Sequence, residues 1–172
     1  MTRRNRVVSS SLVLLLLGAG LPMKNAAAQQ KSFDEALVGT WTFVSGVNTG
    51  TDGTKSSVWG NDAAGMQIFD NTHHFSSQIV RTTIPKLVSN NRLDGTTDEF
   101  KAVAKGILSS FGTYSLENSG NRLVQHIEAS SFPNFNGKDR TWTIAVKGEE
   151  LTMSTQAAAS GGSAELKWKR IK

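Results

Sequence analysis

A histidine and a glutamate stand two residues apart in the segment 123–144, where polar and apolar side chains alternate. In an extended strand His126 and Glu128 point to the same face, about 7 Å apart, because successive side chains alternate between faces. An imidazole and a carboxylate at this spacing could anchor a ligand hydroxyl or carbonyl group, or act as a general acid and base. These residues therefore predict a polar site on one face of this strand.

The direction of that face stays open at the level of the sequence. If His126 and Glu128 point inward, they line a ligand pocket within reach of Tyr114 on the preceding strand. Hydrophobicity alone favours the reverse arrangement, in which both side chains are solvated. The opposite face of the strand carries Leu123, Gln125, Ile127 and Ala129.

A cation and an indole share a face of the next extended segment. Arg140, Trp142 and Ile144 alternate there, after a loop at residues 133–137 that contains proline, asparagine and glycine. Such residues can hold the polar and apolar parts of a ligand in one pocket. Of the four tryptophans we assign Trp142 to the pocket, and Trp59 as a second candidate from a long loop. The predicted ligand-binding residues are Tyr114, His126, Glu128, Arg140 and Trp142.

The patterns of a metal site and of a catalytic nucleophile are missing. The chain has no cysteine. His73 and His74 are adjacent, so in a strand they point to opposite faces and cannot readily share one ion. The sequence also lacks a Gly-x-Ser-x-Gly segment and a phosphate-binding glycine loop. We therefore expect no metal, no cofactor and no catalytic nucleophile.

The first 28 residues have the three parts of a secretory signal. Residues 1–6 form a basic head, residues 7–22 an apolar centre, and residues 26–28 are alanines suited to cleavage. The apolar run is shorter than the roughly 20 residues that a membrane-spanning helix needs. Arg3 and Arg4 also permit a twin-arginine route, so the export route stays open. We expect an exported protein, periplasmic or secreted, with a mature domain at residues 29–172 and no membrane span.

The basic character of the chain belongs mostly to this leader. The whole sequence has 19 basic and 14 acidic residues and an isoelectric point of about 9.7. Cleavage removes Arg3, Arg4, Arg6 and Lys24 but no acidic residue, which leaves 15 basic against 14 acidic side chains. A nearly neutral domain has no general attraction for polyanions. We therefore expect neither a nucleic acid nor an anionic membrane as partner.

Short segments rich in β-branched and aromatic residues recur along the chain, and turns separate them. Eight strands are predicted, at residues 39–45, 65–69, 74–81, 113–117, 122–129, 141–146, 151–154 and 164–171. One helix follows the third strand, beginning at a capping box formed by Thr96 and Glu99. We expect this helix to bury an apolar stripe against the sheet. The stripe comprises Phe100, Val103, Ala104, Ile107 and Leu108.

The chain resembles the lipocalin-like domain family, bacterial and fungal proteins of the calycin group. The resemblance rests on LVGTWTFVS (37–45), FDNTHHFSSQIVR (69–81), SSFGTYSLE (109–117), HIEASSFPNFNG (126–137) and GEELTMST (148–155). It implies an all-β fold, an eight-stranded antiparallel up-and-down barrel with one helix inserted between strands 3 and 4. A barrel of this kind is open at one end and can take one small, hydrophobic molecule.

The resemblance also implies how the other end of the barrel is closed. In lipocalins a basic residue of the last strand lies over the tryptophan of the first strand in a cation–π contact. Gly39 and Trp41 match the first strand, and Arg170 matches the basic residue. Lys169 is the alternative, because the sequence does not fix which of the two neighbouring residues of the last strand points inward. These roles are structural.

Three classes of function are compatible with the sequence. The one we favour is an exported protein that binds a small hydrophobic molecule in the barrel cavity. The second is a barrel enzyme, a cyclase, isomerase or dehydratase, acting on an unsaturated lipid or polyketide-like substrate with His126 or Glu128 as acid or base. The third is a structural or protein-binding module with a filled barrel, using an exposed loop such as residues 82–95. Neither the ligand nor the oligomeric state follows from the sequence.

Overall fold

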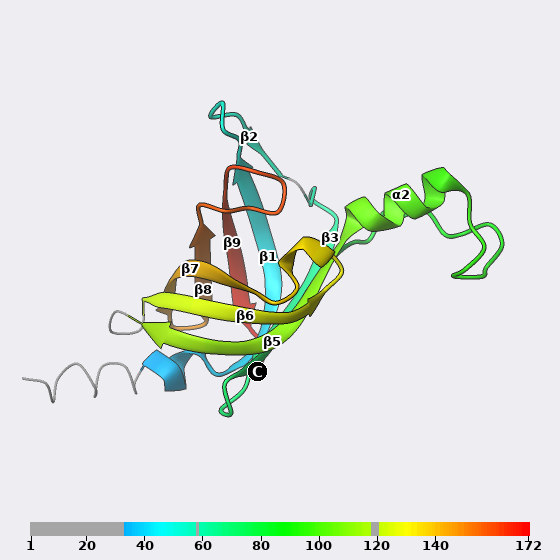
Figure 1. The fold of residues 1–172 in the computed structure, drawn as a ribbon. Helices are drawn as coiled ribbons and strands as arrows, with labels where there is room; N and C mark the ends of the chain where they lie inside the picture. The colour runs from blue at the N-terminus through cyan, green and yellow to red at the C-terminus, as the bar shows by residue number, and fades with distance from the viewer. Residues whose placement is uncertain (1–32, 58, 118–120) are drawn as a thin grey trace, which may run out of the picture.

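Antiparallel strands close into a barrel in the computed structural model, which describes residues 33–57, 59–117 and 121–172 (Figure 1). The predicted leader at residues 1–28 lies outside the described residues, so it stays a prediction. One sheet has the strand order β2-β1-β3-β4-β5-β6-β7-β8-β9, and β1 also pairs with β9. Sequence neighbours are sheet neighbours throughout the barrel wall, which is the up-and-down topology.

Eight strands form the wall, because β2 is only two residues long and pairs with the end of β1. The helix lies between β4 and β5, the third and fourth strands of the wall, so the predicted fold class is confirmed. The elements are β1 (Gly39–Thr49), β2 (Lys55–Ser56), β3 (Ala63–Phe69), β4 (His74–Arg81), α2 (Thr97–Gly106), β5 (Ile107–Glu117), β6 (Arg122–Ser130), the 3₁₀ turn η2 (Pro133–Phe135), β7 (Lys138–Lys147), β8 (Glu150–Thr155) and β9 (Ser163–Arg170).

Alternating side chains give each strand an inner and an outer face. The inner face carries the large apolar residues because their burial removes the most apolar surface from water. Along β6 the alternation is strict, with Leu123, Gln125 and Ile127 buried and His126 and Glu128 exposed. The most deeply buried apolar side chains of the barrel are Leu37, Trp41, Phe69, Leu123, Ile127, Leu151, Met153 and Trp168.

Arg170 and Trp41 lie together at the closed end of the barrel. The Arg170 guanidinium carbon is 4.1 Å from the centroid of the Trp41 ring, and its nitrogens donate to the Val38 carbonyl at 2.7 Å and to the Ala36 carbonyl. Residues 33–37 form a helical turn whose end at Leu37 accepts a 3.0 Å hydrogen bond from the indole nitrogen of Trp41. A side chain at Gly39, where φ is +142°, would collide with Arg170. Lys169, the alternative, is exposed.

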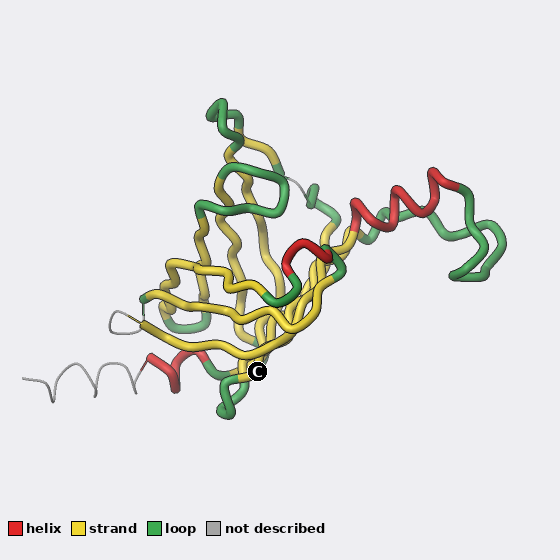
Figure 2. The backbone as a smooth tube through the Cα atoms, viewed as in Figure 1, coloured by secondary structure: helices red, strands yellow, loops and turns green. Residues whose placement is uncertain are grey.

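Helix α2 begins as predicted but does not pack on the sheet. The Thr96 hydroxyl accepts from the Glu99 amide at 3.3 Å, and the Glu99 carboxylate accepts from the Thr96 amide at 2.7 Å, which completes the capping box. The helix and residues 82–96 project from the barrel as an arm (Figure 2). Phe100 is 40% exposed, and Gly106 is the buried residue of this helix. The expectation that the helical stripe covers the sheet is therefore wrong.

The helix also ends earlier than its apolar periodicity indicates. Ile107 and Leu108 belong to β5, where they pair with Val80 and Ile79 of β4. Ladder hydrogen bonds to a neighbouring strand override a helical pattern of one or two turns, because helix propensity is a weak preference. Within residues 33–57, 59–117 and 121–172, no helix is long and apolar enough to cross a membrane.

The contacts of Arg170 predict a stability effect. Arg170→Met leaves two backbone carbonyls without their charged donor and removes the cation–π contact, so we expect the free energy of unfolding to fall by about 2–4 kcal/mol. Lys169→Met is the matched control on the exposed face of the same strand and should change it by about 0.5 kcal/mol or less. Urea unfolding followed by tryptophan fluorescence measures both. Equal effects would contradict the closing role of Arg170.

Candidate binding site

The end of the barrel opposite Trp41 opens into a cavity of about 740 Å³. This volume is within the roughly 300–1,000 Å³ typical of small-molecule sites. Its apolar wall comes from the inner faces of the strands and from the connections at the open end. The lining includes Trp59, Ile79, Ala104, Ile107, Leu108, Phe132, Pro133, Trp142, Met153, Ala158, Ala159, Ala164 and Leu166. A filled barrel, the third interpretation of the sequence, does not fit this cavity.

Two glutamine side chains line the cavity deep in the barrel. Gln67 of β3 and Gln125 of β6 are 1% and 3% exposed. The Trp142 indole nitrogen donates to Gln125 Oε1 at 2.8 Å, and because an indole N–H only donates, this bond sets the orientation of the amide. The Nε2 groups of both glutamines lack hydrogen-bond partners within the described chain. A buried donor without a partner lowers the stability of the fold by about 1–3 kcal/mol. Both amide groups can therefore donate a hydrogen bond to an acceptor atom of a ligand.

Arg140 is the strand neighbour of Gln125 and also lines the cavity. Its guanidinium carbon is 4.2 Å from the centroid of the Phe135 ring and 4.6 Å from that of Trp142. Phe135 lies in the turn η2, so this turn and β7 together hold the guanidinium. Burial lowers the pKa of Arg140 to about 10, which leaves the side chain charged at neutral pH.

A second hollow of about 540 Å³ lies beside the first along β7. Strand β7 pairs with β8 only over residues 143–147, so residues 138–142 pair with β6 alone. Lys138, Asp139 and Gln156 line this second hollow, and Arg140 lines both hollows. Arg140 therefore stands in the barrel wall between the cavity and the second hollow.

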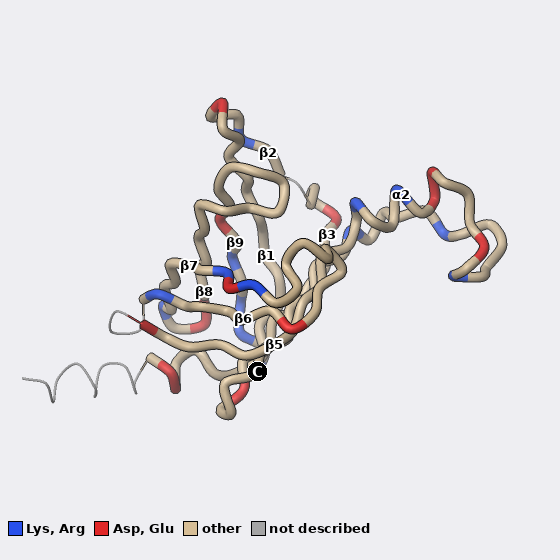
Figure 3. Tube along the Cα trace, viewed as in Figure 1, with Lys and Arg blue, Asp and Glu red and all other residues tan. Residues whose placement is uncertain are grey.

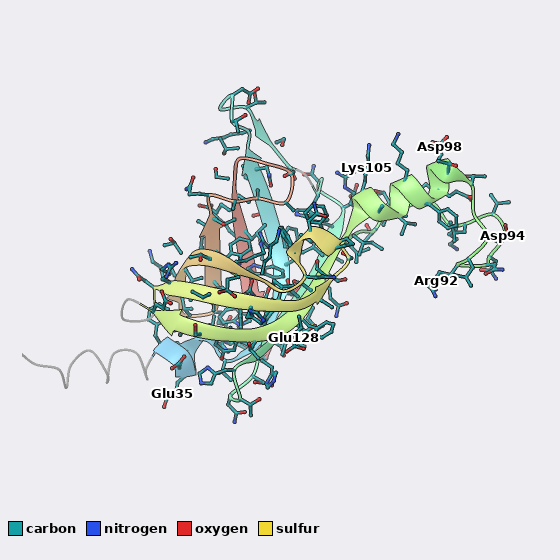
Figure 4. All side chains as sticks on the ribbon, in the orientation of Figure 1. Glu35, Arg92, Asp94, Asp98, Lys105 and Glu128 are labelled. Atoms are coloured by element: carbon teal, nitrogen blue, oxygen red, sulfur yellow. The ribbon has the colours of Figure 1, made fainter. Side chains whose placement is uncertain are left out.

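The structure brings Arg140 and Trp142 together in the cavity but places His126 and Glu128 elsewhere. His126 Nδ1 lies 2.8 Å from Asp139 Oδ1, and both side chains are more than half exposed. Figure 4 shows Glu128 on the outer side of the barrel wall. The expectation that these two residues line the cavity is therefore wrong. The apolar face of β6 points inward because burying apolar side chains is favourable, whereas burying an imidazole and a carboxylate costs free energy.

Tyr114 is buried, but it lies at the closed end and is not among the cavity-lining residues. Its hydroxyl donates to the Asp70 carbonyl at 2.8 Å, and its ring packs edge-on against Phe69 with centroids 5.1 Å apart. Burial raises the pKa of Tyr114 to about 12, with smaller contributions from Asp34 and Asp70. The structure therefore ties Tyr114 to the turn between β3 and β4 and leaves it outside the cavity lining.

Sequence reasoning missed Gln67, Arg81, Lys105 and Gln125 as cavity residues. A signal existed for the glutamines, since Gln125 stands between Leu123 and Ile127 on one strand face, and Gln67 shares a strand face with Phe69. Arg81 and Lys105 carried no such signal. Arg81 is the last residue of β4 and Lys105 lies in the last turn of α2, and the fold brings both to the cavity wall. Among the residues that the structure describes, no group of three or more His, Cys, Asp or Glu side chains is arranged to hold a metal ion.

Comparison with known proteins agrees with this geometry. Residues 38–171 match the model of the lipocalin-like domain. The chain belongs to this family. It is also similar to a protein of Aspergillus oryzae (strain ATCC 42149 / RIB 40) named 4'-hydroxy-3'-methoxypropiophenone carrier protein ppsC. The two are 30% identical over 86 residues, which cover 46% of this lipocalin-like chain and 78% of the relative.

The outward position of His126 and Glu128 leads to a negative prediction for binding. His126→Ala and Glu128→Ala should each leave the affinity of this lipocalin-like protein for a cavity ligand within about twofold of wild type. Loss of the exposed His126–Asp139 pair should cost about 0.2–1 kcal/mol of stability at most. Fluorescence titration with a cavity probe, together with thermal unfolding, measures both quantities. A tenfold loss of affinity in either variant would place the ligand on the outer face of β6.

Proposed function

We propose that this lipocalin-like protein is an exported carrier that binds a small, largely apolar molecule inside its barrel. The observation that carries the proposal is the cavity of about 740 Å³ with two buried amide donors on its wall. Unpaired donors in an apolar cavity destabilise the protein unless a ligand acceptor satisfies them. Binding is therefore the use of this interior that best explains why Gln67 and Gln125 are there.

The lining indicates an aromatic or similarly flat ligand with oxygen acceptors. Trp59 and Trp142 supply large aromatic surfaces, while Ile79, Met153 and Leu166 supply aliphatic contact. Aromatic pairs add about 0.5–1.5 kcal/mol beyond area burial, so indole rings favour an aromatic partner. The similar Aspergillus protein is named as a carrier of an oxygenated aromatic ketone, which supports the same ligand class here.

The enzyme interpretation has less support from the site. It assigned acid or base catalysis to His126 or Glu128, and both side chains face away from the cavity. A general acid or base must come within hydrogen-bond reach of the reacting group. Among the described residues that line the cavity there is no histidine, aspartate or glutamate. Binding without turnover is thus the function that we favour.

Binding inside the barrel can be tested with the neutral fluorescent probe N-phenyl-1-naphthylamine. Ser77 lines the cavity, and Ser115 is exposed on the neighbouring strand β5. We expect Ser77→Phe to weaken probe binding by about tenfold or more, because the new ring occupies ligand space and one factor of ten is about 1.4 kcal/mol. Ser115→Phe adds the same ring outside the barrel and should bind the probe as wild type does.

Two results would contradict the proposed binding function. One is the absence of saturable probe binding by the folded wild-type protein, and the other is equal binding by both phenylalanine variants. Native mass spectrometry of protein taken from its own host tests the cargo directly. We expect a co-purifying molecule with an aromatic ring, and added 4'-hydroxy-3'-methoxypropiophenone should appear as a one-to-one complex.

Export is the second part of the proposal, and it rests on the leader pattern of residues 1–28 alone. Expression of the full chain should yield a protein in the periplasm or the medium whose mass corresponds to a start near residue 29. Replacing apolar residues 12–17 with alternating serine and aspartate should leave the precursor uncleaved and inside the cell. Cleavage and release that persist in this variant would refute the export proposal.

A further inference from the structure

The charged side chains that line the cavity are all basic. Arg81 of β4, Lys105 of α2 and Arg140 of β7 all contribute to its wall. No carboxylate is present among the described residues that line it. The predicted mature chain, in contrast, has almost equal numbers of basic and acidic residues, and Figure 3 shows acidic residues, in red, along many other elements of the chain. The excess of positive charge is thus a property of this cavity and not of the whole protein.

The two buried amides of the cavity also offer hydrogen-bond donors to a ligand. Nε2 of Gln67 and Nε2 of Gln125 are buried donors without partners in the described part of the chain. The acceptor of Gln125, its Oε1 atom, is already occupied by the Trp142 indole. Gln67 and Gln125 therefore present unpaired donors to a ligand, while the acceptor of Gln125 is occupied.

Arg140 has the geometry of an oxyanion receptor. Phe135 and Trp142 lie at 4.2 and 4.6 Å from its guanidinium carbon and hold the group by cation–π contacts. A guanidinium binds an oxyanion through the N–H groups of its planar fork, often with two parallel hydrogen bonds. The ion pairs formed among residues 33–57, 59–117 and 121–172 do not include Arg140.

We propose that the ligand of this cavity is an amphipathic organic anion, with an apolar, aromatic body and one oxyanion end that Arg140 binds. The oxyanion can be a carboxylate, a sulfonate or an ionised phenol, since each matches the guanidinium fork. Gln125 Nε2, next to Arg140 across the strands, supplies a further donor. This inference rests on the proposed function, namely that the barrel cavity binds a small molecule.

Arg140 is chosen over the other basic residues beside the two hollows because two aromatic rings hold its guanidinium in the wall. Arg81 and Lys105 also line the cavity, and they add positive potential at its open end. Lys138 and Asp139 line the second hollow with Arg140. Asp139 forms its ion pair with His126. Because burial lowers the hydration of Arg140, its interaction with an anion is less screened by solvent than that of a surface arginine.

Two fluorescent probes with nearly the same apolar body test the anion preference. N-phenyl-1-naphthylamine is neutral, and 1-anilinonaphthalene-8-sulfonate carries an added sulfonate. The quantity to measure is the ratio of their association constants, sulfonate over neutral probe. We expect Arg140→Gln to lower this ratio by about tenfold or more, because a hydrogen bond to a charged group contributes about 1.5–3 kcal/mol.

Matched variants distinguish the effect of the planar guanidinium group on anion binding from the effect of positive charge alone. Arg140→Lys keeps the charge without the planar fork and should give an intermediate ratio. Lys169→Gln removes one exposed positive charge from the outer face of β9 and should leave the ratio at its wild-type value. Ser77→Phe should weaken both probes, which shows that both bind inside the barrel. In the wild-type protein, raising the salt concentration should weaken the sulfonate probe alone.

The outcomes distinguish this inference from the proposed function. If neither probe binds the folded wild-type protein in a way that Ser77→Phe reduces, the proposed binding function itself fails. If both probes bind inside and Arg140→Gln changes them by the same factor, the barrel is a carrier but Arg140 does not select anions. A ratio that falls equally in Arg140→Gln and Lys169→Gln would also overturn the inference, since it would report only net charge.

Discussion

The pairing of β1 with β9 is the constraint on which the rest of this structure depends. It joins the first and last strands of the sheet and brings Trp41 opposite Arg170. Once the sheet is closed, every strand has one face inside the barrel. Because side chains alternate along a strand, the position of each residue then fixes whether its side chain points inward or outward. The Arg170–Trp41 contact and the helical turn at residues 33–37 seal the end where the chain enters. The longer connections at the other end then border the cavity.

A closed barrel of eight strands encloses more space than its apolar side chains occupy here. The interior therefore keeps a cavity, and that cavity holds groups that are costly to bury, namely the amides of Gln67 and Gln125 and the guanidinium of Arg140. Polar groups of this kind lower stability when unpaired, so a purely structural barrel would do better with aliphatic residues. Their presence is the physical link between the fold and the carrier function that we propose.

Part of the candidate site could be predicted from the sequence, and individual residues show the physical reason. Arg140 and Trp142 were assigned to the pocket from alternation and residue type, and both line it. His126 and Glu128 were assigned by the same kind of reasoning and face solvent, because alternation names the residues that share a face but not the direction of that face. Tyr114 shows a different limit, since it does point inward but lies at the closed end of the barrel.

Local patterns in the sequence predicted the strands and the position of the inserted helix, because these depend on alternation, capping and turns between neighbours. The resemblance to the lipocalin-like family implied the closed barrel and the closing pair of Trp41 and Arg170, with Lys169 as the alternative. The tertiary structure alone decided which face of β6 is buried. The same holds for helix α2, which projects from the barrel (Figure 2), and for Lys105 near its end, which lines the cavity. It also decided that the rings of Phe135 and Trp142 hold Arg140 in place. Such outcomes depend on contacts between segments far apart in the chain, whose energies no local pattern contains.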